Sequence, residues 1–204
     1  MVFTHAQRSC TGDVTVKGMK LGSIASRGQL RMSFVRWAAF VVPLVLLLGF
    51  LSGRSVASGS ENAWYVALAK PGFTPPGWVF PVAWTILYVL IGFALAIALS
   101  ARGAALRTAG VVLFAAQFAL NLAWTPLFFG AHKVGAALFV IVLIFALSVA
   151  TAWVFSRFRP TAAALMIPYI AWLAFAGVLN WQIVRMNPHA DTIVPAGGTS
   201  QMIG

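Results

Sequence analysis

The chain of 204 residues is 61% hydrophobic and only 8% charged, and it carries a formal net charge of +11. A soluble domain carries about a quarter charged residues, so this composition excludes an ordinary water-soluble fold. The Lys and Arg residues lie at the ends of apolar runs, where they suit anionic headgroups, so we expect membrane lipid as a partner and no nucleic acid.

Residues 1–33 form a basic, polar tail that we expect to be disordered. This tail lacks the apolar stretch and the small-residue cleavage site of a secretory signal. Met32 directly precedes the first apolar run and offers an alternative start. Cys10 is the single cysteine, and the three histidines are scattered, so we expect neither an intrachain disulfide nor a metal site.

The remainder of the chain contains five apolar segments without acidic or basic residues in their centres. Each is long enough to cross about 30 Å of hydrocarbon as a helix, whereas a lone strand would leave its backbone unpaired. We therefore predict an all-α membrane protein, a five-transmembrane-helix bundle in a domain of residues 34–187, followed by a flexible tail, 188–204. The predicted spans are about 35–53, 78–100, 105–130, 133–156 and 160–185.

The connection between the first two spans is much longer than the others. Residues 52–77 are rich in Gly and Pro, yet they include Trp64, Tyr65 and Phe73. A long loop with aromatic side chains is expected to pack over a site, so we predict a lid-like loop. The other connections are short and predict antiparallel neighbours.

The distribution of basic residues predicts the orientation. Ten Lys and Arg residues lie on the side of the N-terminal tail, and four lie on the opposite side. The positive-inside rule then places the N-terminus in the cytoplasm and the C-terminus outside.

Acidic residues are confined to Asp13, Glu61 and Asp191, which all lie outside the predicted spans. Ion-coupled transporters place ionisable groups at membrane depth, and hydrolytic triads need a His with an acid. The sequence therefore predicts neither of these mechanisms.

Three spans carry a stripe of aromatic and amide side chains at helical spacing. Such side chains can serve as interfacial belts or bridge helices. Together, however, three stripes beside a lid predict an apolar cavity for a flat, hydrophobic ligand. The stripes are Phe80, Trp84 and Tyr88; Gln117, Asn121, Trp124 and Phe128; and Tyr169, Trp172, Ala176 and Asn180.

Ala115, Ala119 and Ala123 recur every four residues on another face of the third span. Small side chains at this spacing let two helices approach closely. This face is a candidate dimer contact, and packing within one monomer is the alternative.

Four long motifs in this chain resemble the translocator-protein (TspO/MBR) family, and the resemblance extends over residues 34–187. The motifs are WYVALAKP at 64–71, PPGWVFPVAWTILY at 75–88, QFALNLAWTPLFFG at 117–130 and PYIAWLAFAGVLN at 168–180. The resemblance implies a five-helix bundle, commonly a homodimer, in a membrane that we expect to be bacterial. Trp181 stands where animal members carry the Tyr of a cholesterol motif, which argues against sterol selectivity.

The resemblance also implies a tetrapyrrole ligand, protoporphyrin IX or haem, and no obligatory cofactor. Three functions follow from it: a sensor that signals to an unidentified partner, a transporter of porphyrins or related metabolites, and a light-dependent porphyrin-degrading activity that uses Trp84 and Trp172. The implied ligand-binding residues are Tyr65, Pro75, Trp84, Tyr88, Asn121, Trp124, Phe128, Trp172 and Ala176.

Overall fold

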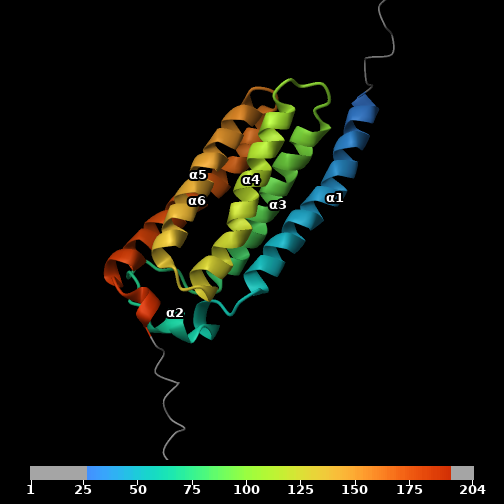
Figure 1. Cartoon of the computed structure of the whole chain (residues 1–204). Helices are drawn as coiled ribbons and strands as arrows, with labels where there is room; N and C mark the ends of the chain where they lie inside the picture. Colours follow the sequence, from blue (N-terminus) through green and yellow to red (C-terminus); the bar gives the residue numbers. More distant parts are fainter. Residues whose placement is uncertain (1–26, 194–204) are drawn as a thin grey trace, which may run out of the picture.

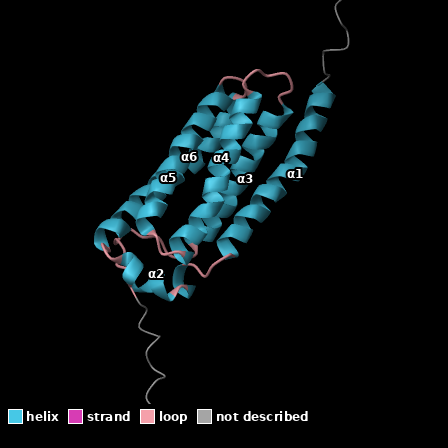
Figure 2. Ribbon diagram, in the orientation of Figure 1, coloured by secondary structure: helices cyan, strands magenta, loops and turns pink. Residues whose placement is uncertain are grey.

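The computed structural model describes residues 27–193, and its long elements are all helices (Figures 1 and 2). Five of them are long and apolar enough to cross a membrane, so the predicted all-α five-helix bundle is confirmed. The chain is an integral, multi-pass membrane protein. The helices are α1 (Arg27–Arg54), α2 (Ala63–Ala67), α3 (Val79–Ser100), α4 (Arg107–Thr125), α5 (Val134–Ser156) and α6 (Pro160–Met186), with the short elements η1 (Gly59–Glu61), η2 (Pro126–Gly130) and η3 (Ala190–Thr192).

Both ends of the bundle are more ordered than the sequence predicts. Helix α1 begins at Arg27, so residues 27–33 of the predicted disordered tail are helical. Its first turns contain Gln, Leu and Met, which are good helix formers. After α6, residues 188–193 of the predicted flexible tail include η3, which packs on the loops at that end of the bundle. The rest of both predicted tails, 1–26 and 194–204, lies outside the described residues.

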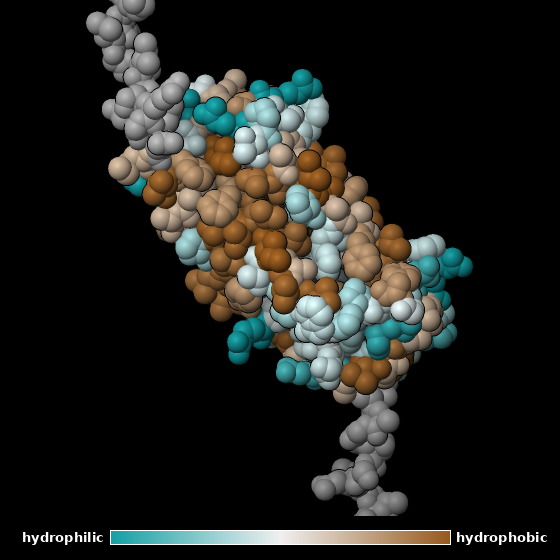
Figure 3. Space-filling model, turned by 180° about the vertical axis from the view of Figure 1, so that it is seen from behind, coloured by the Kyte–Doolittle hydropathy of each residue, from teal (hydrophilic) through white to brown (hydrophobic). Residues whose placement is uncertain are grey.

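The surface has the pattern expected of a protein surrounded by lipid. Figure 3 shows a wide hydrophobic band between two ends that carry the hydrophilic residues. Large apolar side chains on this surface are well exposed, among them Phe139 at 69%, Ile167 at 63% and Phe40 at 63%. An apolar surface of this size would be covered in a soluble monomer, whereas acyl chains cover it in a bilayer.

Helices in this bundle pack closely through small residues. Helix α1 contacts α3, α3 contacts α6, and α5 contacts both α4 and α6. Ala94 and Ala98 of α3 are fully buried, as is Ala162 of α6. At the α1–α3 contact, a Cβ atom on Gly92 would lie 3.1 Å from Cα of Val42. Small side chains bring the backbones together, as is usual in membrane bundles.

Gly110 gives a direct test of this packing. A Cβ atom there would lie 2.8 Å from Cε1 of Phe155, whose side chain is fully buried and has no room to move. We expect Gly110→Ala to destabilise the bundle by about 1–3 kcal/mol through overpacking. Gly135→Ala is the matched control, because a Cβ atom on Gly135 has no neighbour within 4 Å. Thermal unfolding in detergent should show a lower Tm for the first variant only.

Candidate ligand-binding site

A cavity of about 750 Å³ lies at the end of the bundle covered by the long loop, and this size is typical of small-molecule sites. We call residues 55–78 the lid. The cavity is lined by the end of α1, the lid, the start of α3, the end of α4 with η2, and α6. Its exposed lining residues, which we call the mouth, come from α1, the lid and the start of α3. They include Gly53, Arg54, Ser60, Glu61, Gly77 and Pro81.

Eight aromatic residues line the cavity, and they come from α1, the lid, α3, α4 and η2. The ring of Trp84 lies against Tyr88 on α3, with centroids 5.2 Å apart. From α4 and η2, Trp124 stacks on Phe128 with centroids 4.9 Å apart and planes at 16°. The two pairs present apolar, π-rich surfaces from different helices. Such a wall suits a flat, apolar ligand better than a strongly hydrated one.

The π-helix η2 explains how consecutive aromatic residues reach the cavity. Pro126 has no N–H, and the chain continues from α4 into one turn of π-helix, Pro126–Gly130, that ends with the Ala131 amide donating to the Pro126 carbonyl (2.9 Å). Phe128 is thereby buried beneath the lid, 5.7 Å from Trp64, and Phe129 lies 5.3 Å from Tyr65. Pro126 thus stands at the first position of the π-helical turn.

The inner end of the cavity is bounded by neutral polar side chains. The Tyr88 hydroxyl donates to Oδ1 of Asn121 (3.0 Å). Deeper in the bundle, the Tyr169 hydroxyl donates to Oε1 of Gln117 (2.8 Å), which also accepts from Ser148 (3.3 Å). Among the described residues Nε2 of Gln117 has no hydrogen-bond partner. These bonds tie α3, α4, α5 and α6 together below the cavity without placing a charge there.

The lid is held closed over the cavity by its own side chains. Oδ1 of Asn62 accepts from the Tyr65 amide (2.9 Å) and caps α2, and Nδ2 of Asn62 donates to the Phe129 carbonyl (3.1 Å). At the other end of α2, the Lys70 ammonium donates to the carbonyls of Tyr65 (2.8 Å), Leu68 (2.8 Å) and Val66 (3.2 Å). Two residues thus fix the short helix that carries Tyr65.

Burial shifts the pKa values of two side chains in the lid, Tyr65 and Lys70. It raises the pKa of the Tyr65 phenol, so the phenol stays neutral and keeps its donor. It lowers the pKa of the Lys70 ammonium, which also lies 4.8 Å from the centroid of the Tyr65 ring.

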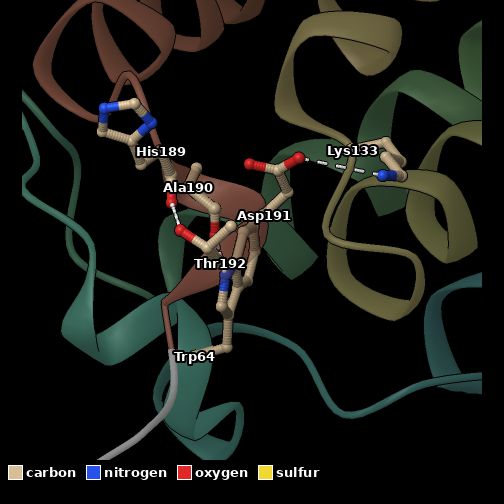
Figure 4. A network of polar contacts seen from close by, with 6 residues as sticks. All are labelled: Trp64, Lys133, His189, Ala190, Asp191 and Thr192. Carbon is tan, nitrogen blue, oxygen red and sulfur yellow. Dashed lines mark hydrogen bonds and ion pairs between the residues drawn. The ribbon is translucent and has the colours of Figure 1, made fainter.

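A second set of contacts joins the lid to the chain beyond α6. Oδ1 of Asn187 accepts from the Ala69 amide (2.9 Å), and Nδ2 of Asn187 donates to the Ala69 carbonyl (2.9 Å). Nε1 of Trp64 donates to the Ala190 carbonyl (2.7 Å), as Figure 4 shows. We call residues 187–193 the latch, because they hold both ends of α2.

Weaker contacts surround the same latch. The Trp64 ring stacks on His132 with centroids 4.3 Å apart, and His132 adopts a left-handed φ of 57°. Lys133 and Asp191 form an ion pair at 3.9 Å (Figure 4). Both side chains are more than half exposed, so this pair adds little stability. The buried Trp64 side chain therefore contributes more stability than the Lys133–Asp191 ion pair where the lid meets the latch.

Most of the nine predicted ligand-binding residues line the cavity, but Asn121 and Trp172 do not. Seen from the cavity, Asn121 lies behind Tyr88 and accepts a hydrogen bond from its hydroxyl. Trp172 lies in a separate apolar groove of about 480 Å³ on the outer surface between α3 and α6. The residues that line the cavity are Tyr65, Pro75, Trp84, Tyr88, Trp124, Phe128 and Ala176.

The displacement of Trp172 follows from helix geometry. At 3.6 residues per turn, Trp172 points about 60° to one side of Tyr169 and about 80° from Asn180, although all three belong to one predicted stripe. Tyr169 and Asn180 are buried in the bundle, whereas Trp172 is turned towards α3 and lies 6.0 Å from Phe80.

Sequence reasoning missed several parts of the site. Gly49 and Gly53 of α1 line the cavity, but a glycine in an apolar helix gives no pattern that points to a site. Asn180 appears in a predicted stripe without a role. In the amide orientation that satisfies both groups, it donates to the Val134 carbonyl (3.2 Å) and accepts from the Leu138 amide (3.0 Å), which ties α6 to the start of α5.

The three alanines of the predicted dimer face lie on the outer surface of α4. Ala115, Ala119 and Ala123 are all exposed. They do not pack within the monomer, so that alternative is wrong. Their face is open to lipid or to another protein.

Metal-binding groups are sparse in this region. Across residues 27–193, no three His, Cys, Asp or Glu side chains lie close enough together to hold a metal ion. The cavity lining contains no His or Cys.

Lys70 offers a test of the lid structure. Lys70→Met would remove the ammonium donor from three carbonyl groups, and each hydrogen bond to a charged group contributes about 1.5–3 kcal/mol when well formed. We expect hydrogen exchange in residues 63–71 to become about tenfold faster, as measured by mass spectrometry. Lys133→Met is the control, because Lys133 makes only an exposed ion pair, and it should leave these peptides unchanged.

Residues 40–186 match the sequence model of the TspO/MBR family, from the middle of α1 to the end of α6. The chain belongs to this family. The TspO/MBR match includes the second half of α1, the lid, α3 to α6 and every residue that lines the cavity.

Named TspO/MBR proteins from distant organisms show the same relationship. The chain is 39% identical to the tryptophan-rich protein TspO of Chlorobaculum tepidum over 151 residues, which are 74% of this chain and 95% of that protein. It is 43% identical to the translocator protein of Sus scrofa over 141 residues, 68% of this chain and 83% of that protein. It is 38% identical to the tryptophan-rich sensory protein of Cereibacter sphaeroides over 149 residues, 70% of this chain and 91% of that protein.

Proposed function

We propose that this TspO/MBR protein is a membrane receptor that binds a tetrapyrrole, such as protoporphyrin IX or haem, in the cavity beneath the lid. The single observation that carries the proposal is the aromatic wall of a cavity of about 750 Å³, with stacked pairs from α3 and α4–η2 facing a common space. A tetrapyrrole is flat, apolar over both faces and large, so it can stack on several rings at once.

Ring stacking, and not iron ligation by His, would hold such a ligand. The cavity lining has no His or Cys, and His132 lies outside it, against the lid residue Trp64. A metal-free porphyrin should therefore bind about as well as haem. This makes protoporphyrin IX the appropriate probe.

A receptor role is favoured over transport by the closed inner end. The Tyr88–Asn121 hydrogen bond and the hydrogen bonds from Tyr169 and Ser148 to Gln117 tie four helices together between the cavity and the opposite end of the bundle. Transport would require this buried network to open. The name of the Cereibacter sphaeroides relative, a tryptophan-rich sensory protein, supports a sensing role. In proteoliposomes we expect binding of protoporphyrin IX without flux.

The proposal is tested by titrating the purified protein in nanodiscs with protoporphyrin IX and following tryptophan fluorescence. We expect saturable quenching that weakens at least about fivefold in Trp84→Phe, because Trp84 lies in the cavity wall. Trp172→Phe is the matched control, since Trp172 lies in the outer groove, and its affinity should stay unchanged. Unsaturable quenching, or equal affinity losses in both variants, would contradict the proposed site.

The same two variants address light-dependent degradation of the porphyrin. Of Trp84 and Trp172, the two tryptophans that the family resemblance implies for this reaction, only Trp84 lines the cavity. If illumination of the bound porphyrin yields a product, its formation should depend on Trp84 and be insensitive to Trp172→Phe. Equal product from all three proteins would exclude a tryptophan-dependent reaction.

We also propose that the exposed alanine face of α4 contacts a second copy of the chain. Ala115, Ala119 and Ala123 form a smooth strip where two helices can approach closely. Ala119→Cys in a Cys10→Ser background should form a disulfide-linked dimer in native membranes. Ala136→Cys, exposed on α5, should not. The orientation with the N-terminus in the cytoplasm, proposed from the basic residues, can be read in the same membranes by cysteine labelling.

A further inference from the structure

The mouth of the cavity carries charge, whereas its walls do not. Among the residues that line the cavity, the charged ones are Arg54, Glu61 and Lys70. All three lie at the lid end, in the last turn of α1 or in the lid itself. Two positive groups and one negative group give the lid end of the cavity a net positive charge. Arg54 and Glu61 are exposed at the mouth, and Lys70 is half-buried in the lid beside it.

The two basic residues are not equivalent. Lys70 directs its ammonium at two backbone carbonyls of α2 and at that of Leu68, directly after it, so its donors have partners within the lid. Arg54 is exposed and, among the described residues, has neither a hydrogen bond nor an ion pair through its side chain. Its guanidinium is therefore the basic group at the mouth that is free to bind a ligand. Planar guanidinium groups bind carboxylates through two parallel hydrogen bonds.

The neutral interior restricts how a charged ligand could enter. Tyr88, Phe128 and Leu179 line the inner part of the cavity and are buried, with no cationic group beside them. A carboxylate placed there would lose its hydration without a partner, which is strongly unfavourable. The acidic edge of a ligand must stay at the mouth, where water and Arg54 are available.

We infer that Arg54 binds the carboxylate of the ligand and that the site selects flat, hydrophobic molecules with an acidic group along one edge. This inference rests on the proposed function and adds to it the orientation of the ligand and the residue that recognises its acid. Protoporphyrin IX or haem would insert with the edge that carries the vinyl groups towards Tyr88 and its propionates at Arg54. Neutral apolar molecules of the same shape would fit the walls but lack this contact.

The test compares two probes of one shape, protoporphyrin IX and its uncharged dimethyl ester. Affinities are measured by fluorescence titration in nanodiscs of neutral lipid for the wild type, Arg54→Gln and Arg102→Gln. Arg102 is an exposed arginine in the α3–α4 turn, at the opposite end of the bundle. The ratio of acid affinity to ester affinity is compared between proteins, so differences in how the probes partition into lipid cancel.

We expect Arg54→Gln to lower the affinity for the acid about tenfold and to leave the affinity for the ester unchanged. Arg54→Lys should recover part of the loss, and Arg102→Gln should alter neither probe. Glu61→Gln should strengthen acid binding only, because it removes the negative charge from the same mouth. The contribution of Arg54 should also shrink as salt is raised.

An unchanged ratio in Arg54→Gln would overturn the inference while leaving the proposed function in place, provided that the wild type binds both probes saturably. Equal losses for acid and ester would likewise overturn it, because they indicate damage to the cavity and not loss of a charge contact. If neither probe binds the wild type saturably, the proposed function fails and the inference with it. Should Arg54→Gln fold poorly, the ratios from Arg54→Lys and Glu61→Gln decide the question.

Discussion

Replacing Gly49 with alanine is expected to weaken the binding of protoporphyrin IX at least about tenfold. Gly49 lies on α1 and lines the cavity, and a Cβ atom there would overlap the ring of Tyr88. Tyr88 cannot move freely, because its hydroxyl is bonded to Asn121 and its ring lies 5.2 Å from Trp84. Overpacking of this kind costs about 1–3 kcal/mol. Either α1 moves outward or the Tyr88 ring turns, and each change deforms the wall.

Gly53→Ala provides a matched control for this prediction. Gly53 lies one turn further along α1 and also lines the cavity, but a Cβ atom there has no neighbour within 4 Å. Both variants add one methyl group to the same helix, and alanine is a better helix former than glycine in each. We expect fluorescence titration to show a normal affinity in Gly53→Ala. Equal affinities in the two variants would mean that the Gly49–Tyr88 contact does not shape the binding site.

The helices of this protein could be predicted because membrane physics leaves few alternatives. Any chain segment that crosses the hydrocarbon must satisfy its own backbone, so a long uncharged run has to be a helix. The predicted boundaries of the spans agree with α3, α4–η2, α5 and α6 to within a few residues. Helix α1 extends further than predicted because it continues past the membrane into polar residues, where hydropathy gives no signal.

Contacts around the cavity were harder to predict, since they depend on how each helix is rotated. Trp84 and Trp172 are both tryptophans within predicted stripes, yet Trp84 lines the cavity and Trp172 lines the outer groove. A rotation of about 60° within one stripe is enough to make this difference. The latch could not be predicted at all, because Trp64 binds the backbone carbonyl of Ala190, and a carbonyl group has no sequence signature.

Trp64→Ala should release the lid and speed the dissociation of protoporphyrin IX at least about tenfold. Trp64 is 2% exposed, packs on Phe128 and His132, and donates to the Ala190 carbonyl. Removing a buried Trp side chain costs about 3–5 kcal/mol, and here the loss falls on the contacts that hold the lid against Phe128, His132 and the latch. A lid that opens more often lets the ligand leave more often. Stopped-flow displacement of bound protoporphyrin IX measures this rate.

Two further variants separate the parts of this effect. Trp64→Phe keeps the aromatic packing and loses the bond to Ala190, so it should show a smaller increase in the dissociation rate. Trp78→Ala removes an exposed tryptophan from the other end of the lid, and because its side chain is 68% exposed it should dissociate like the wild type. A normal rate in Trp64→Ala would show that the latch does not hold the lid closed. A fast rate in both Trp64 variants, with a normal rate in Trp78→Ala, would assign part of the control of ligand release to the hydrogen bond between Trp64 and Ala190, 126 positions apart in the chain.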